Sequence, residues 1–298
     1  MGRSDFLCAG LVILLLHLIP GILGWGKLGH YATCKIAEAY LTKGASAAVK
    51  SLLPRIAEGD LANVCAWPDQ SRFRYRWSSA LHYSDTPDFR CNYVFKRDCH
   101  DTKGQEKRCV TGAINNYTTQ LMSYKDTYSS KRYNLTEALM FLAHFIGDVH
   151  QPLHVGFVGD LGGNTINVHW YRRRSNLHHI WDTLFIESAM KTLYSEDLGV
   201  MIKSIRKNIT DGWRDELKNW GDCAKARVIC PGSYASESIK LACKYVYRNA
   251  TPGTTLDDDY FYSRLPIVEK RLAQGGVRLA AVLNRIFTRK SLVLQQWD

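Results

Sequence analysis

The segment from residue 134 to residue 150, NLTEALMFLAHFIGDVH, constrains the fold more than any other part of the chain. Asn134 is expected to cap a helix, Glu137 follows three residues later, and Pro152 stands just beyond the end. The predicted helix is apolar on nearly every side, which is typical of a helix buried among other elements. The chain must therefore supply a large core around it.

Two polar residues interrupt this apolar helix. His144 and Asp148 are four residues apart and share one face, and a buried charge is costly unless it is paired or bound to a metal. The pattern recurs at His178 and Asp182 in NLHHIWDTLF. Two such pairs indicate two sides of one metal site, since imidazole and carboxylate are ligands of zinc. Two His-Asp pairs that satisfy only each other in the core are the alternative.

Other candidate ligands stand both close to these helices and far upstream in the sequence. His179 is about 100° around the helix from His178 and does not share the face of Asp182, so His178 is the expected ligand. His154 follows the turn at Pro152, and Asp69 and His82 stand upstream in WPDQ and LHYSD. Their spacing alone does not bring them together.

Residues 1–24 have the pattern of a secretory signal peptide: Arg3, an apolar run over 11–19 and a helix break at 20–21. The run is shorter than the roughly 20 apolar residues of a spanning helix, so an uncleaved anchor is the weaker interpretation. Cleavage after residue 24 would make Trp25 the first residue.

Cysteine usage agrees with secretion. Of nine cysteines, removal of Cys8 leaves eight, and an even number without C-x-x-C spacing favours four disulfides over a metal cluster. Spacing does not choose among the pairings. Four glycosylation sequons stand at Asn116, Asn134, Asn208 and Asn249.

Helical periodicity dominates the rest of the chain, and no repeat or linker divides it. We expect one mainly α-helical domain with a short β-hairpin or extended arm at 165–172, after the turn at 162–164. The expected helices are 28–41, 111–124, 134–150, 176–193, 198–217, 234–248 and 257–287, the last weakened near Gly275-Gly276.

The composition excludes a disordered tail and a fibre, because 46% of the 298 residues are hydrophobic and suffice for a large core. A multi-span membrane protein is excluded because no long uncharged stretch lies beyond the N-terminal segment. With 39 Lys+Arg against 28 Asp+Glu, the net charge of +11 indicates an anionic partner such as nucleic acid, or only a basic soluble protein.

Six motifs in order resemble those of the zinc-dependent single-strand-preferring nucleases, and most closely the plant bifunctional (type I) nucleases. They are WGKLGH at 25–30, WPDQ at 67–70, LHYSDTP at 81–87, FLAHFIGDVHQPLHVG at 141–156, GDLGGN at 159–164 and NLHHIWD at 176–182. The resemblance implies the mainly α-helical fold shared with zinc phospholipases C, a trinuclear zinc site, and a domain over 25–287. The tail at 288–298 is either kept or removed on maturation.

The resemblance also implies a role for each ligand. One zinc would take Asp69, His82, His144 and Asp148, the second Trp25, His30 and Asp148, and the third His154, His178 and Asp182. Asp148 would bridge two ions, and Trp25 would bind through its α-amine and carbonyl oxygen, which only cleavage after residue 24 creates.

The implied chemistry is hydrolysis of the phosphodiester by a metal-activated water, without a covalent intermediate. Asp69, Asp148 and Asp85 are the expected catalytic residues. Tyr83 would stack a base, and Asp85 and Asn164 would contact the nucleotide. For each of these three, a purely structural role is the alternative. Thr183 stands where some relatives have Asn, which leaves the base preference open. Arg90 stands near the position of a site lysine of the fungal enzymes and is not counted as catalytic.

Arginines at 72, 74 and 76 and at 172–174 either track phosphates or lie in solvated loops. By the same resemblance the disulfides would be Cys34–Cys65, Cys91–Cys243, Cys99–Cys109 and Cys223–Cys230.

The function expected from these observations is a secreted endonuclease, extracellular (apoplastic) or vacuolar, that cuts single-stranded DNA and RNA to 5′-phosphate products and has 3′-nucleotidase activity. We expect a monomer with three Zn²⁺ and no stable membrane association. A zinc phospholipase C is one alternative, and it should expose an apolar lipid-entry face. A non-catalytic zinc-stabilised protein is the other, although structural zinc sites are closed by four ligands and rarely cluster.

Overall fold

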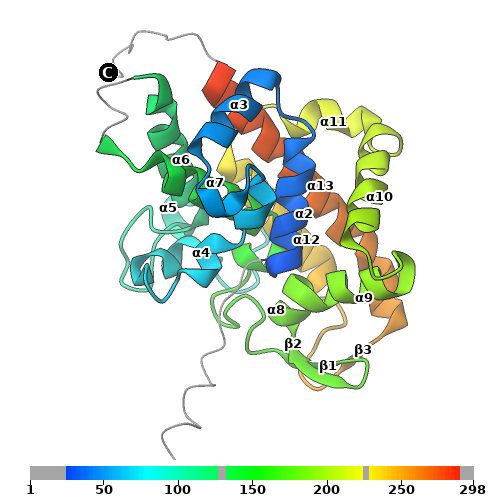
Figure 1. The fold of residues 1–298 in the computed structure, drawn as a ribbon. Helices are drawn as coiled ribbons and strands as arrows, with labels where there is room; N and C mark the ends of the chain where they lie inside the picture. The colour runs from blue at the N-terminus through cyan, green and yellow to red at the C-terminus, as the bar shows by residue number, and fades with distance from the viewer. Residues whose placement is uncertain (1–24, 127–131, 224–227, 289–298) are drawn as a thin grey trace, which may run out of the picture.

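The computed structural model describes residues 25–126, 132–223 and 228–288, so the expected signal peptide, Cys8 and all but the first residue of the tail lie outside it (Figure 1). The prediction of a mainly helical fold is confirmed. The helices are α2 (Lys27–Glu38), α3 (Lys43–Leu52), α4 (Trp67–Gln70), α5 (Phe95–Asp98), α6 (Val110–Met122), α7 (Leu135–His150), α8 (Leu177–His179), α9 (Phe185–Leu193), α10 (Leu198–Thr210), α11 (Arg214–Trp220), α12 (Pro231–Leu241) and α13 (Asp258–Thr288).

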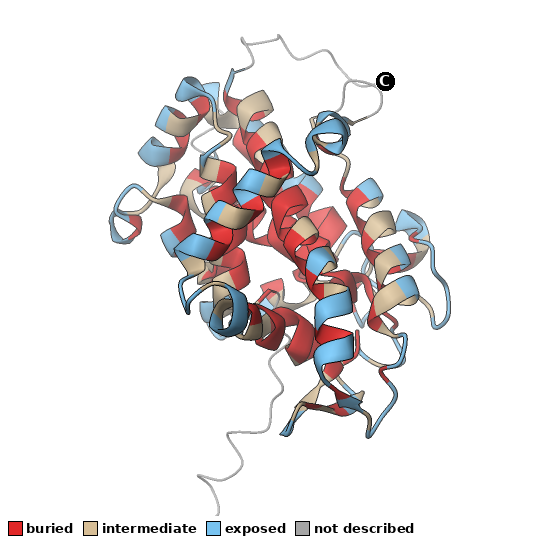
Figure 2. Cartoon of the chain, turned by 90° about the vertical axis from the view of Figure 1, so that its right-hand side faces the viewer, coloured by how far each residue is buried: buried red, intermediate tan, exposed pale blue. Residues whose placement is uncertain are grey.

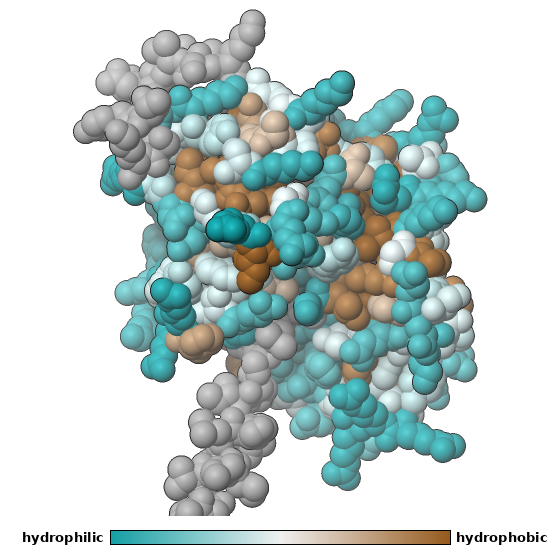
Figure 3. Space-filling model, in the orientation of Figure 1, coloured by the Kyte–Doolittle hydropathy of each residue, from teal (hydrophilic) through white to brown (hydrophobic). Residues whose placement is uncertain are grey.

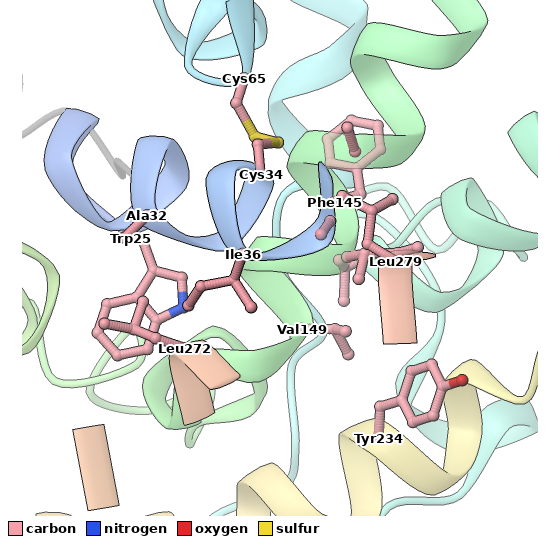
Figure 4. Close-up of a cluster of buried hydrophobic side chains, with 14 of the residues drawn as sticks. Trp25, Ala32, Cys34, Ile36, Cys65, Phe145, Val149, Tyr234, Leu272 and Leu279 are labelled. Carbon is pink, nitrogen blue, oxygen red and sulfur yellow. A yellow bond between two sulfur atoms is a disulfide. The ribbon is translucent and has the colours of Figure 1, made fainter. Parts of the chain in front are cut away.

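Helix α7 lies at the centre, as its composition requires. Every residue from Ala138 to His150 is buried, and Asn134 caps the helix by accepting a hydrogen bond from the backbone N–H of Glu137. Helices α2, α6, α12 and α13 pack around it, and Figure 2 shows the buried residues, in red, concentrated in the interior of the helical assembly. Figure 4 shows side chains of α2, α7, α12 and α13 in one apolar cluster.

Helix α13 continues through the glycine pair that was expected to weaken it. A Cβ at Gly276 would lie 2.5 Å from Cγ2 of Ile36, and a Cβ at Gly275 would lie 3.1 Å from Cγ2 of Thr33. The two glycines therefore allow α2 to approach α13 closely, and packing outweighs the low helix propensity of glycine.

Other helices also differ from the prediction. The predicted helix 198–217 is two helices, because the chain leaves the helical path at residues 211–213 between α10 and α11. Two predicted helices each contain a π-helical turn, Ile180–Leu184 and Ala242–Val246. Helix α3, rich in small residues, was not predicted.

The strand prediction at 165–172 corresponds to a small three-stranded sheet. Strand β1 (Asn167–Trp170) pairs antiparallel with β2 (Arg173–Asn176) and parallel with β3 (Thr255–Leu256). The order is β2-β1-β3, and the turn before β1 leads to the candidate site.

Four disulfides join the pairs that the resemblance implied. Cys34–Cys65 ties α2 to the residue after the short helix Leu61–Val64 (Figure 4). In the described ranges, no helix is long and apolar enough to cross a membrane.

Candidate metal centre

Imidazoles and carboxylates from several elements converge at the buried end of α7. Each side chain is almost completely buried, including Asp69, whose side chain is 7% exposed. Three groups of these residues have ligand atoms that all lie within 4.8 Å of one another. They are His30, Asp69 and His144, then His82, His144 and Asp148, and then His154, His178 and Asp182.

The first part of the centre surrounds Asp148. Its Oδ2 lies 3.0 Å from Nδ1 of His82 and 3.3 Å from Nε2 of His144. Oδ1 of Asp69 faces the same two nitrogens at 3.5 Å and 3.6 Å. The four side chains thus turn their ligand atoms toward one another.

His30 contacts the other carboxylate oxygen of Asp148. Its Nε2 lies 3.2 Å from Oδ1 of Asp148, and its ring stacks on His144 with 3.7 Å between centroids. A Cβ at residue 147 would lie 2.8 Å from Nδ1 of His30, so Gly147 is required for α2 to bring this imidazole to α7. The two oxygens of Asp148 therefore face two different sets of imidazoles.

The second part of the centre joins the turn after α7 to the start of α8. Nε2 of His178 lies 3.1 Å from Oδ2 of Asp182, and Nε2 of His154 lies 3.8 Å from Oδ1. The π-helical turn holds Asp182 on the same side as His178. His179, which is half-buried, belongs to none of the three groups.

Backbone carbonyls orient three of the imidazoles. Nδ1 of His144 donates to the carbonyl of Cys65 at 2.8 Å, Nδ1 of His154 to that of His82 at 2.6 Å, and Nδ1 of His178 to that of Gly162 at 2.6 Å. Such outer contacts fix the ring and its tautomer, so that Nε2 carries the lone pair that can bind a metal.

Sequence reasoning missed a residue that acts on Asp182. Nε2 of Gln151 donates to Oδ1 of Asp182 at 2.5 Å, while its Oε1 accepts from the N–H of Leu153 at 2.6 Å. Gln151 is fully buried. Its place between the ligand positions Asp148 and His154 was the only signal in the sequence.

The centre has the chemistry of a cation site. Oδ1 of Asp69 and Oδ1 of Asp148 are buried without a hydrogen-bond partner, as are both ring nitrogens of His30. Burial lowers the pKa of His144, but Asp148 and Asp69 outweigh it and raise this pKa to about 10. Burial raises the pKa of Asp148, yet His144 and the other imidazoles hold it well below its usual range. Bound cations would neutralise the buried carboxylates in place of the protonated imidazoles that do so without metal.

Trp25 lies beside the centre. It is fully buried, and a Cβ at Gly29 would lie 2.8 Å from Cβ of Trp25. The N–H of the next residue, Gly26, donates to the carbonyl of Asp182 at 2.8 Å. The beginning of the described chain is thus held between α2 and the turn that carries Asp182.

A small cavity of about 100 Å³ adjoins the second part of the centre. Tyr83, Asp85 and His178 line it, together with Leu161 and Val158. Burial raises the pKa of Asp85. Asn164 is not among its lining residues; its side chain donates to the carbonyl of Leu161 at 2.8 Å and so closes the turn.

The two arginine clusters have different positions. Arg72 is mostly buried, with Nη1 3.9 Å from Oδ1 of Asp69, so it lies beside the centre. Arg74 and Arg76 are exposed. In the second cluster, Arg172 lies in the hairpin turn, and Arg173 and Arg174 begin β2 and pair with β1.

The fold and the site together define a helical protein with a buried histidine-aspartate metal centre. The family model S1/P1 Nuclease matches residues 25–288, and the chain belongs to this family of metal-dependent nucleases. It is 62% identical to Endonuclease 4 of Arabidopsis thaliana, with 94% of each chain covered. It is 56% identical to Endonuclease 5 of the same plant, over 94% of this chain and 96% of that protein. It is 31% identical to Nuclease P1 of Penicillium citrinum, over 88% of this chain and 97% of that protein.

This membership confirms the resemblance to plant nucleases. The protein is an endonuclease, and the family match decides against the phospholipase and the non-catalytic alternatives.

Proposed function

We propose that this endonuclease depends on zinc, binds three ions per chain, cuts single-stranded DNA and RNA to 5′-phosphate products and also removes the phosphate of 3′-nucleotides. The observation that carries the proposal is the placement of Asp148, whose Oδ1 lies against His30 while its Oδ2 lies against His82 and His144. A carboxylate so placed suits two cations at once.

The buried imidazoles and carboxylates of the centre are residue types that bind zinc. We assign Asp69, His82, His144 and Asp148 to one ion, Trp25, His30 and Asp148 to the second, and His154, His178 and Asp182 to the third. Zinc in such a centre lowers the pKa of bound water and neutralises phosphate charge. Asp69 and Asp148 would hold the positively charged ions in place, and burial keeps bulk water from screening the attraction between the ions and the phosphate.

The cavity beside His178 is the proposed place of the base. Tyr83 supplies a ring for stacking, which tolerates any base. Because burial raises the pKa of Asp85, its carboxyl can donate as well as accept a proton, either to a base edge or in the reaction. Asn164 supports the wall by fixing the turn at Leu161.

The proposal includes a route through the secretory pathway to the cell exterior or the vacuole. Its support is the signal-like segment 1–24, the four disulfides and the exposure of three sequon asparagines, Asn116, Asn134 and Asn249, with Asn208 half-buried. We propose a mature monomer that begins at Trp25 and extends to residue 287, with a tail at 288–298 that is removed or left.

Metal analysis of the secreted protein, combined with N-terminal sequencing and a chelation assay, tests this proposal. We expect three zinc ions per chain, a Trp25 start, and loss of cleavage of single-stranded DNA and RNA with chelator, restored by zinc. Full activity after complete metal removal would overturn the mechanism. A mature chain that begins elsewhere would remove Trp25 from the ligand set.

A further inference from the structure

A groove between α2 and α10, here called the α2/α10 groove, is separate from the metal centre. It has a volume of about 950 Å³. Figure 1 shows the two helices side by side, and Figure 3 shows apolar surface in their region bordered by hydrophilic side chains. None of the proposed metal ligands lines it.

The floor of the groove is apolar and partly aromatic. Leu28 and Tyr31 from α2 and Ile202 from α10 form part of it, and Tyr40 lies at the end of α2. Tyr31 and Tyr40 are both half-buried, so part of each side chain remains accessible. Aromatic rings in a groove can stack nucleic-acid bases without regard to sequence.

The rim carries positive charge. Lys27, Lys203, Arg206 and Lys207 line the groove and are exposed, and none of them makes an ion pair within the described ranges. Lys35 also lines it but already pairs with Glu38 and Asp60. No aspartate or glutamate lines the groove. The four cations without an acidic partner favour a polyanionic ligand. The apolar, partly aromatic floor favours a ligand that also carries flat apolar groups, such as bases.

The charges on α10 follow one side of the helix. Arg206 and Lys207 stand three and four residues after Lys203, which places the three cations on one face, and the neutral Thr210 continues that face. At 1.5 Å per residue, α10 gives the groove a length of about 20 Å. Lys27 stands two residues after Trp25, so the groove begins near the end of α2 that holds the metal centre.

We propose that the α2/α10 groove binds a single-stranded segment of the nucleic-acid substrate away from the cleaved bond, with phosphates on Lys203, Arg206 and Lys207 and bases on Tyr31 and Tyr40. The inference rests on the proposed single-strand specificity and extends it, because it predicts that long substrates bind more tightly than dinucleotides.

The test compares two variants of equal charge change in the full secreted protein. K203Q/R206Q/K207Q removes the rim cations of α10. K191Q/K218Q/K240Q neutralises three exposed lysines on α9, α11 and α12 that do not line the groove. The probe is a twelve-nucleotide oligothymidylate with phosphorothioate linkages that slow cleavage, measured by fluorescence anisotropy at several salt concentrations.

We expect the groove variant to bind about tenfold more weakly, and its salt slope to fall by about 2, since each single-strand phosphate contact contributes about 0.7. The KM for long single strands should rise similarly, while kcat for a dinucleotide stays unchanged. Y31A and Y40A should weaken binding without changing the salt slope. The control variant should resemble the wild type.

Equal binding by the groove and control variants would overturn the proposal. So would a groove variant that loses binding only to phosphatidylserine vesicles, because the groove would then meet a membrane surface. Binding does not depend on cleavage, so oligonucleotide binding by a protein that cuts no nucleic acid would contradict the proposed function and leave the groove standing.

Discussion

Gln151 and Asp182 are joined by a buried hydrogen bond of 2.5 Å between Nε2 and Oδ1. The same glutamine accepts from the N–H of Leu153. One side chain thus fixes both a candidate ligand and the turn that leads to His154, and it connects the end of α7 to the helix that begins at residue 177.

Replacing Gln151 by alanine should release Asp182 and leave the N–H of Leu153 unpaired. We expect zinc affinity at the His154, His178 and Asp182 group to fall by about 10-fold to 100-fold, the usual effect of removing an outer partner of a ligand. Competition with a chelator, followed by metal analysis, measures this. Q105A is the control, because Gln105 is exposed. Unchanged retention of all zinc in Q151A would show that Asp182 needs no support.

Asp148 and Asp182 should differ in how many ions they hold. D148N keeps the shape but removes the charge that faces His30, His82 and His144, so we expect the loss of two zinc ions per chain. D182N should lose one. Zinc content after gel filtration distinguishes the two variants. A D148N protein that retains nearly three ions would disprove the bridging role.

The Cys34–Cys65 disulfide should support the metal centre as well as the fold, because the carbonyl of Cys65 accepts from Nδ1 of His144. C34S/C65S removes a disulfide that joins residues 31 positions apart, and we expect the free energy of unfolding to fall by about 3.5 kcal/mol. C223S/C230S removes one that joins residues only 7 positions apart, and the expected loss is about 2.5 kcal/mol. Denaturant unfolding measures both. Only C34S/C65S should also bind zinc more weakly, and equal zinc affinity in the two variants would separate the disulfide from the site.

Glu237 should make stability sensitive to acid. It pairs with Arg271 and Arg278, which are 1% and 5% exposed. Burial raises the pKa of Glu237, but the two arginines outweigh it and lower this pKa. A lowered folded pKa means that the stabilisation is present above the unfolded value and disappears as pH falls through the folded value.

We expect E237Q to lower the free energy of unfolding at neutral pH by about 2 kcal/mol, less than for a fully enclosed pair because Glu237 is 40% exposed. The difference from wild type should shrink in acid. E216Q, which breaks the exposed pair with Lys270, should change little at any pH. Equal pH profiles for E237Q and wild type would contradict this account.

The sequence predicted the helix that matters most and the residues on it, because His144 and Asp148 stand at helical spacing within an apolar segment, which is typical of a buried helix with one polar face. Spacing alone could not show that His30 and Asp69 meet them, since α2 and α4 are brought together by packing across long separations, and only the family resemblance implied that contact. Glycine propensity argued against a continuous α13, and only the contact of Gly276 with Ile36 explains why the helix continues. Gln151 and the α2/α10 groove carried no motif, because both arise from how separate elements pack.

The burial of Trp25 has a practical consequence for anyone producing this protein. Because Trp25 is fully buried and the N–H of Gly26 donates to the carbonyl of Asp182, extra residues placed directly before Trp25 would have to start from beside the candidate metal centre. A purification tag left at that end would compete with the ligands for space. Recombinant protein intended for metal analysis should carry its tag at the other terminus.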